Sequence, residues 1–160
     1  MKRVLLKLSG EALAGDKKTG FDEATCIGVA KQVKTLVDEG YQIAIVTGGG
    51  NFWRGRTSET IDRTKADQIG MLATVMNCIY VSDIFRHVGM KTEIFTPFVC
   101  GAFTSLFSKD AALASLEEGK VQDIHIFQQI QVQYFVQSRL KQMQCFLQKQ
   151  SMEFTTVIRR

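Results

Sequence analysis

The sequence predicts an α/β fold with a mainly parallel sheet. Apolar strands alternate with amphipathic helices through the first 120 residues, and glycine turns follow directly after two of the strands. The pattern changes near Lys120, because residues 121–160 contain no Gly, no Pro and many glutamines. A chain of 160 residues is long enough for one domain with a sizeable core.

The first elements form a strand–helix–strand unit. An apolar strand at residues 4–8 ends at Ser9-Gly10. A helix follows Asp22, which is a good N-cap, and ends at Gly40. The next strand, at residues 41–46, is closed by a Gly triplet. This unit predicts two parallel, neighbouring strands joined by a right-handed crossover.

Three further elements follow the same pattern: a helix at about 64–88, a strand at 92–95 and a short helix at 110–118. Gly89, Pro97 and Gly119 end them in turn. The alternation requires another parallel strand directly after Lys120. Only Val121 fits that requirement, since polar residues follow it, so this strand is expected to be missing.

Composition excludes several classes of function. The net charge of +4 lies mostly in the last forty residues, and no basic stripe indicates a nucleic-acid partner. The four cysteines lie far apart, without the spacing of a zinc site, and indicate reduced thiols in a cytoplasmic protein. No apolar run is expected to reach membrane-spanning length, so no membrane partner is predicted.

The chemistry of the chain is predicted at the carboxyl ends of its first two strands. Ligands of open α/β sheets bind there, and glycine lets backbone N–H groups approach phosphate oxygens. Lys7 and Arg54 lie beside the two glycine turns and could neutralise phosphate charge. A Gly triplet can also be a plain turn, and Lys7 an edge residue. The pattern alone therefore indicates an α/β phosphate-binding domain and no more.

Other candidate residues are weaker. The chain has neither the P-loop pattern nor the G-x-G-x-x-G fingerprint. His87 and His125 have no partner at a useful spacing, and Asp67 by itself is an ordinary surface carboxylate. No residues are predicted to form a metal site.

Three segments together resemble bacterial uridylate (UMP) kinases, which belong to the amino-acid kinase superfold. They are Lys-Leu-Ser-Gly-Glu-Ala-Leu at 7–13, Gly-Gly-Gly-Asn-Phe-Trp-Arg-Gly at 48–55, and the stretch from Ala66 to Asn77. The third segment is distinctive of the UMP kinase branch. The resemblance implies a three-layer αβα sandwich, incomplete here on its C-terminal side, and a homo-hexameric assembly.

The resemblance also implies roles for individual residues. Lys7 and Arg54 would be catalytic, and UMP would contact Gly49 and Asp67. The ATP site would comprise Lys7, Leu8, Ser9, Gly10, Gly50 and Arg54. A GTP-responsive loop would comprise Gly15, Asp16, Lys17, Lys18, Thr19 and Gly20. The implied reaction is ATP + UMP → ADP + UDP with Mg²⁺, in which positioning and electrostatics replace a covalent nucleophile.

The resemblance covers residues 1–120, the N-terminal part of a UMP kinase-like domain, and stops there. Residues 121–160 form a tail that lacks the family's Gly-Gly-Thr-Gly loop, its Thr-Asp-Thr segment and its adenine-binding half. The tail is expected to be disordered or irregularly helical. Its apolar residues would lie on one face of such a helix: Ile126, Phe127, Ile130, Tyr134 and Phe135.

A shifted reading frame explains the tail. Read from the third base of each codon, residues 122–158 can spell Gly-His-Pro-Tyr, then Phe-Ser-Thr-Asp-Thr-Gly, and then a phrase ending in Asp-Gly-Val-Tyr-Asp-Ser-Asp-Pro. That phrase resembles the missing UMP kinase segment. The hypothesis is that a deletion after Lys120 removed one strand and shifted the frame, so that nothing selected the tail to pack.

The chain is therefore expected to be a truncated UMP kinase with weak or no activity. Two alternatives stay open. The chain could be a non-catalytic fragment that binds intact kinase subunits through its long helix. It could instead derive from another kinase of the superfold that acts on an amino acid or a carbamate.

Overall fold

The structure is a computed structural model that describes residues 2–54, 60–124, 143–148 and 154–157. Strands and helices alternate through the first two ranges, as predicted. The strands are β1 (Lys2–Leu8), β2 (Tyr41–Thr47), β3 (Thr92–Thr96), β4 (Ser105–Leu106), β5 (Val121–Ile124), β6 (Met143–Gln148) and β7 (Phe154–Val157). The helices are α1 (Gly10–Ala14), α2 (Glu23–Asp38), α3 (Arg63–His87) and α4 (Lys109–Glu117), with a 3-10 turn, η1 (Gly15–Lys17), after α1.

The strands form one sheet in the order β4-β3-β5-β2-β1-β6-β7. All neighbours are parallel except β6 and β7, so the predicted parallel sheet is confirmed. The strands β1 and β2 are neighbours in register from Lys2 opposite Tyr41 to Leu8 opposite Thr47. Their carboxyl ends therefore lie at the same edge of the sheet.

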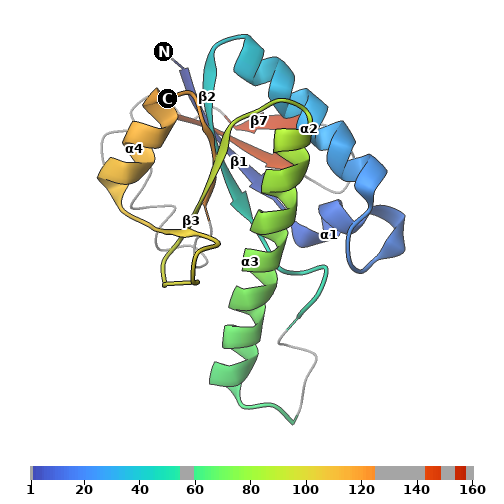
Figure 1. Cartoon of the computed structure of the whole chain (residues 1–160). Helices are drawn as coiled ribbons and strands as arrows, with labels where there is room; N and C mark the ends of the chain where they lie inside the picture. The colour runs from blue at the N-terminus through green and yellow to red at the C-terminus, as the bar shows by residue number, and fades with distance from the viewer. Residues whose placement is uncertain (1, 55–59, 125–142, 149–153, 158–160) are drawn as a thin grey trace.

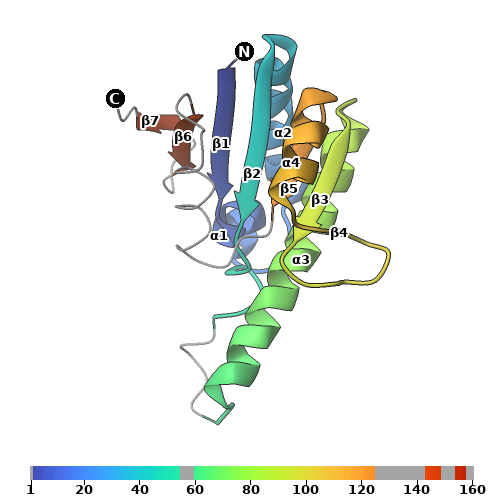
Figure 2. The same cartoon turned by 90° about the vertical axis from the view of Figure 1, so that its left-hand side faces the viewer.

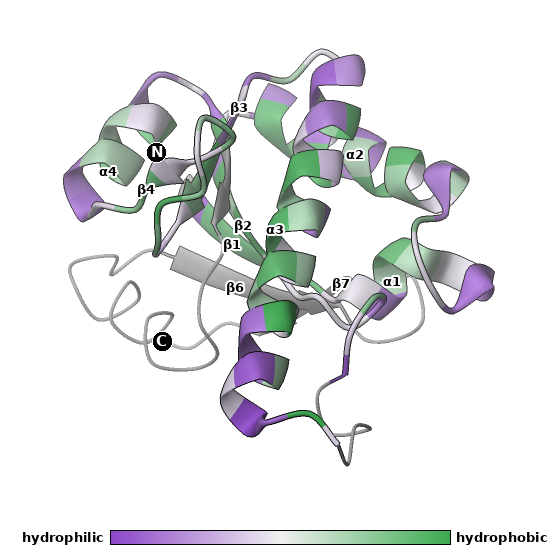
Figure 3. Ribbon diagram, turned by 60° about the horizontal axis from the view of Figure 1, so that its bottom comes forward, coloured by the Kyte–Doolittle hydropathy of each residue, from purple (hydrophilic) through white to green (hydrophobic). Residues whose placement is uncertain are grey.

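Helices cover both faces of this sheet, which makes the three-layer αβα sandwich that the resemblance implied (Figures 1 and 2). Successive strand residues point to opposite faces. On one face, Leu6 and Ile45 pack in a cluster with α2 and α3, and on the other Leu5 and Val46 pack against α4. Figure 3 shows the apolar residues gathered on the strands and on the inner sides of the helices.

The helix boundaries follow from caps that the sequence carries. Asp22 Oδ1 accepts the Thr25 N–H at 2.9 Å, which lowers the pKa of that carboxyl. At the other end of α2, Gly40 takes a φ of +86°, the left-handed conformation that glycine adopts without strain. Both features were predicted. The short helix α1, the turn η1 and the strand β4 were not.

The helix α3 is the longest element, with 25 residues and a length of about 37 Å. Its N-terminal half extends beyond the sheet (Figures 1 and 2). By length and composition alone it could cross a membrane, so the expectation that no segment reaches that length was wrong. However, Val81 and Phe85 are buried in the cluster shared with α2 and the sheet. This packing is typical of a core helix.

The strand expected to be missing after Lys120 is present as β5. It lies between β2 and β3 and is parallel to both, with Val121 opposite Thr92 and Gln122 opposite Ala44. Only backbone groups are needed for such pairing, and the facing edges of β2 and β3 offer them. Val121 is buried in the core. Sequence reasoning missed β5 because it required an apolar run.

The tail also differs from expectation where the structure describes it. Instead of irregular chain or helix, β6 lies parallel to β1, and β7 pairs with β6 in the antiparallel direction. An unpaired strand edge presents a row of donors and acceptors that another strand can satisfy, and β1 offers such an edge. The predicted apolar stretch from Ile126 to Phe135 lies outside the described residues.

No disulfide joins Cys26, Cys78 or Cys100. Cys26 and Cys78 are buried, and Cys100 is partly exposed. Burial raises the pKa of the Cys26 thiol to about 11, so this thiol stays protonated at neutral pH.

Candidate functional site

Two turns meet at the carboxyl ends of β1 and β2. The first turn is Ser9-Gly10, and the second turn is Gly48 to Asn51. The Gly48 N–H donates to the Leu8 carbonyl at 3.1 Å, which continues the strand pairing into the turns. The sequence-based prediction of adjacent glycine turns is therefore confirmed. Backbone groups of both turns face the edge of the sheet at which open α/β proteins bind ligands.

Gly10 is required by close contact between the turns. A Cβ at Gly10 would lie 2.4 Å from Asn51 Oδ1 and 2.7 Å from the Gly50 nitrogen. No side chain fits in that space. Ser9 caps α1, since its Oγ accepts the Ala12 N–H at 3.2 Å. The first turn is thus pressed against the second turn and held at the start of a helix.

The second turn is packed equally closely. A Cβ at Gly49 would lie 2.9 Å from the Gly70 carbonyl oxygen of α3, and one at Gly50 would lie 2.7 Å from Glu11 Oε1. Neither glycine has a positive φ. At position 49 glycine is needed for close approach of the backbone to α3 and not for an unusual conformation, whereas at position 50 the crowding comes only from the end of the flexible Glu11 side chain.

The cationic residues differ in their surroundings. Lys7 is exposed near the end of β1, on the sheet face opposite to the buried Leu8. Leu8 can therefore offer a ligand only backbone groups. Arg54 Nη2 lies 2.6 Å from Glu11 Oε1, and both side chains are partly exposed. This ion pair holds the guanidinium beside the two turns, in a position where an anionic ligand could compete with Glu11.

Asp67 lies near the start of α3. Both of its carboxylate oxygens accept from Arg63 Nε at 3.1 Å, in an exposed pair one helical turn apart. The neighbouring Ala66 carbonyl accepts the Trp53 indole N–H at 2.9 Å. The chain that leaves the second turn is thereby fixed to α3 beside Asp67. Asp67 is therefore linked to the second turn only indirectly, through this hydrogen bond of Trp53. The described hydrogen bonds of the Asp67 side chain go to Arg63 and not to the glycine turns.

The predicted 15–20 loop lies against the second turn. Within it, η1 spans Gly15, Asp16 and Lys17, and Lys18 takes a φ of +62°. The Thr19 hydroxyl donates to the Asn51 carbonyl at 2.9 Å, and the Gly20 N–H donates to the same carbonyl at 3.3 Å. In return, the Asn51 side-chain amide donates to the Gly20 carbonyl at 2.8 Å. Phe21 then stacks on Tyr80 of α3 with ring centroids 3.8 Å apart.

Sequence reasoning assigned no role to three residues that shape the site: Glu11, Asn51 and Asn77. Glu11 pairs with Arg54, and the two asparagines join the second turn to α3. All three lie inside the segments that carried the resemblance. A polar residue placed at helical spacing on the otherwise buried side of α3 was the available signal for Asn77.

A metal site of protein ligands is absent from the described residues, since no three His, Cys, Asp or Glu side chains cluster there. Mg²⁺ that arrives with a nucleotide needs no such cluster. It is commonly held by phosphates, waters and one or two carboxylates. Glu11 is the carboxylate that lies beside both turns.

Comparisons with known proteins agree with this geometry. A family model described as the amino acid kinase family matches residues 2–137. The solved structure of a UMP kinase from Bacillus anthracis superposes with a TM-score of 0.73 at 31% identity, over 78% of this chain and 52% of that one. A UMP kinase from Ureaplasma parvum gives 0.72 at 26% identity, over 78% of this chain and 55% of that one. This chain thus spans about half the length of each. By its fold, its glycine turns and its match to the family model, the chain belongs to the amino acid kinase family.

Proposed function

We propose that this chain carries the phosphate-binding part of a UMP kinase, an enzyme that transfers the γ-phosphoryl group of ATP to UMP and gives UDP. The observation that carries the proposal is the contact between the two glycine turns, where a Cβ at Gly10 has no room. The resemblance of three segments to UMP kinases and the two UMP kinase neighbours support the choice of substrate.

The residues divide the work as follows. Backbone N–H groups of Ser9, Gly10 and Gly50 contact the phosphates of ATP. Lys7 and Arg54 neutralise charge that develops on the transferring group, and Arg54 exchanges its partner Glu11 for phosphate oxygens. Gly49 and Asp67 contact UMP. Mg²⁺ bound with ATP would screen the charge of its phosphates, with Glu11 as the neighbouring carboxylate. We expect GTP to act at the 15–20 loop, and the enzyme to work in the cytoplasm as a hexamer.

We further propose that this chain alone turns over UMP weakly or not at all. It spans about half of the UMP kinases that it resembles, and its tail lacks the motifs expected for the uridine and adenine sites. Phosphoryl transfer depends on positioning both substrates in line, so half of a cleft gives little catalysis.

Titration calorimetry with ATP tests the binding role of the chain as it stands. Lys7→Ala should weaken binding by about tenfold, which corresponds to one lost charge-assisted contact of about 1.4 kcal/mol. Lys31→Ala removes an exposed lysine of α2 and should leave the affinity unchanged. Equal effects of the two substitutions, or no ATP binding by the unaltered chain, would remove the support for an ATP site.

The substrate is tested on a chain whose reading frame is restored after Lys120. ADP release should depend on UMP and should not be supported by glutamate, aspartate or carbamate. Phosphorylation of an amino acid but not of UMP would establish the alternative assignment within the same family.

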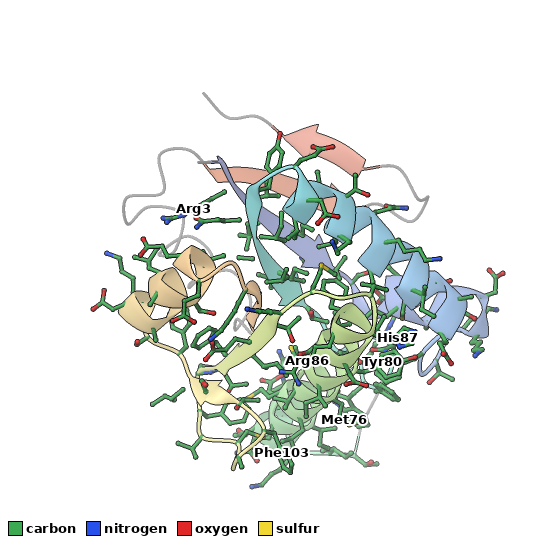
Figure 4. The ribbon with its side chains drawn as sticks, turned by 45° about the horizontal axis from the view of Figure 1, so that its top comes forward. Arg3, Met76, Tyr80, Arg86, His87 and Phe103 are labelled. Atoms are coloured by element: carbon green, nitrogen blue, oxygen red, sulfur yellow. The ribbon has the colours of Figure 1, made fainter. Side chains whose placement is uncertain are left out.

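One observation favours a second function, in which the chain binds intact kinase subunits. The outer face of α3 exposes a row of apolar side chains, of which Met76 is labelled in Figure 4: Ile69, Leu72, Met76 and Ile79. Each of these side chains is between 38% and 54% exposed. A row of exposed apolar side chains on one helix face is unusual unless another protein covers it. Co-purification of the tagged chain with full-length UMP kinase, abolished by Leu72→Glu and not by Lys65→Glu, would support this function.

A further inference from the structure

Two buried asparagines form a reciprocal amide pair behind the glycine turns. Asn51 Nδ2 donates to Asn77 Oδ1 at 3.1 Å, and Asn77 Nδ2 donates to Asn51 Oδ1 at 2.7 Å. Their exposed fractions are 3% and 0%. An amide that is removed from water in this way needs all its donors satisfied, because an unpaired buried N–H is costly.

The remaining donor of each amide goes to a different segment of backbone. Asn51 Nδ2 also donates to the Gly20 carbonyl at 2.8 Å, and Asn77 Nδ2 to the Gly48 carbonyl at 2.6 Å. All four amide N–H groups of the pair are therefore used. The pair joins the end of the 15–20 loop, the second turn and the middle of α3.

The first turn is also held by this pair. The space in which Gly10 would carry a Cβ is filled by Asn51 Oδ1 and by the Asn51 backbone nitrogen. In addition, the Asn51 carbonyl accepts from the Gly20 N–H at 3.3 Å and from the Thr19 hydroxyl at 2.9 Å. Asn51 thus touches both turns and the loop, and its side chain is held by Asn77 on one side and by the Gly20 carbonyl on the other.

We propose that Asn51 and Asn77 are positioning residues that set the spacing of the two glycine turns and join the 15–20 loop to them as one rigid unit. Their role toward nucleotide phosphates rests on the function proposed above. Among the described hydrogen bonds none joins the loop to Asn77 directly, so the hydrogen-bonded route from Asn77 to the loop runs through Asn51. A change in the loop must likewise shift the second turn.

The chemistry of the pair favours positioning over simple packing. Two apolar side chains could fill the same volume, whereas a cyclic amide pair fixes direction and register because each hydrogen bond has a narrow range of angles. Neither amide titrates. The coupling should therefore be independent of pH between 5 and 9, in contrast to a device built on histidine or a carboxylate.

Hydrogen exchange of the full chain tests the coupling. The variant Asn77→Leu keeps the approximate volume and removes every hydrogen bond of the Asn77 amide. Amides of residues 48–53 and of residues 19–22 should both exchange at least about tenfold faster, since a lost buried hydrogen bond corresponds to about 1.4 kcal/mol. If Asn77→Leu does not fold, Asn77→Ala removes the same hydrogen bonds with a smaller side chain and serves the same comparison.

Ser82→Ala is the matched control. Ser82 lies on the same helix, is buried, and loses a hydroxyl contact of 2.7 Å to Thr92 that is remote from the turns. It should leave exchange in both segments unchanged. Faster exchange in residues 48–53 alone, or equal acceleration in Ser82→Ala, would overturn the proposal.

Nucleotide affinity separates this inference from the proposed function. ATP should bind about tenfold more weakly to Asn77→Leu than to the unaltered chain, and equally well to Ser82→Ala. If the unaltered chain binds no ATP, the proposed function fails, and the exchange comparison still decides whether the amide pair couples the loop to the turns.

Discussion

The two parts of this chain are held in structure by different means. In residues 1–120, all four α-helices begin at a side chain that accepts a backbone N–H, namely Ser9, Asp22, Asp62 and Ser108. Each of these helices is followed by a glycine of positive φ, namely Gly15, Gly40, Gly89 and Gly119. In residues 121–160, the described elements are three strands, which are placed by backbone pairing.

The difference shows what a sequence must encode and what the backbone supplies. A helix end needs a particular side chain because its first N–H groups have no partner in the helix. A strand beside an open edge needs only its own N–H and C=O groups. Backbone pairing can thus extend a sheet without the side-chain signals that a capped helix or a glycine turn needs.

Restoring the reading frame should have the largest effect on this contrast. Under the shifted-frame hypothesis, a frame-restored chain that carries the family's segment after Lys120 should phosphorylate UMP at a rate typical of kinases, about 1–100 s⁻¹. The chain described here should be slower by about 10³-fold or more, since loss of even one preorganised contact costs about 10²–10³. A coupled ADP-release assay measures both. Comparable rates would mean that residues 121–160 complete the cleft.

Stability should be concentrated in the first part. Phe85→Ala removes a large, fully buried side chain from the core and should lower the free energy of unfolding by about 3–5 kcal/mol. Deletion of residues 125–160 should lower it by less, because the described strands that it removes, β6 and β7, lie at one edge of the sheet, whereas Phe85 lies in the core cluster. Urea denaturation of the two variants gives the comparison. A larger loss on deletion would place the tail within the cooperative core.

Two glycines provide a sharper test within the first part. Gly10→Ala should destabilise the protein by about 1–3 kcal/mol, because its Cβ overlaps Asn51 and backbone nitrogen atoms. Gly28→Ala should instead stabilise it by about 0.5–1 kcal/mol, since Gly28 lies inside α2 with nothing within 4 Å of its Cβ position. Thermal unfolding of both variants should show shifts of opposite sign. Destabilisation by both would mean that helix propensity does not govern position 28.

Loss of the ion pair between Glu93 and Lys120, at the boundary between the two parts, should have the smallest effect on stability. Glu93 is partly buried, which raises its pKa, but hydrogen bonds from Lys120 and Ser105 outweigh this and hold the pKa below the ordinary 4.5. The carboxylate therefore stabilises the fold above pH 4.5, and this contribution is lost as the pH falls below that value. Glu93→Gln should cost about 1 kcal/mol or less at pH 7. The cost should shrink toward pH 3 in urea titrations, and a pH-independent difference would exclude the ion pair as its cause.

Much of the fold was predictable because its signals are local. Strand residues 4–8, the Asp22 cap and the Gly40 stop each follow from a few neighbouring residues, and their alternation indicates a parallel sheet. The strand β5 was not predictable, because its pairing depends on edges of β2 and β3 that no sequence window contains. The sequence did not indicate that α3 is long and apolar enough to cross a membrane, because polar residues interrupt its apolar run.

The site was predictable in part for the same reason. Glycines after strands indicate where backbone groups gather, and they identified both turns. The roles of Glu11, Asn51 and Asn77 arise from contacts across 26 to 43 positions in the sequence, which spacing alone does not reveal. The resemblance to UMP kinases supplied roles for Lys7 and Asp67, whereas the structure places Asp67 in an exposed pair with Arg63.

The short sequence span of the amide pair has a consequence for synthesis on the ribosome. Every residue that joins the two turns lies within the first 77 positions. Domains fold from the N-terminus as the chain emerges, so these contacts can form before the codons after position 120 are translated. A genetic lesion at that point would then abolish catalysis, and each nascent polypeptide would still contain the two glycine turns already in contact.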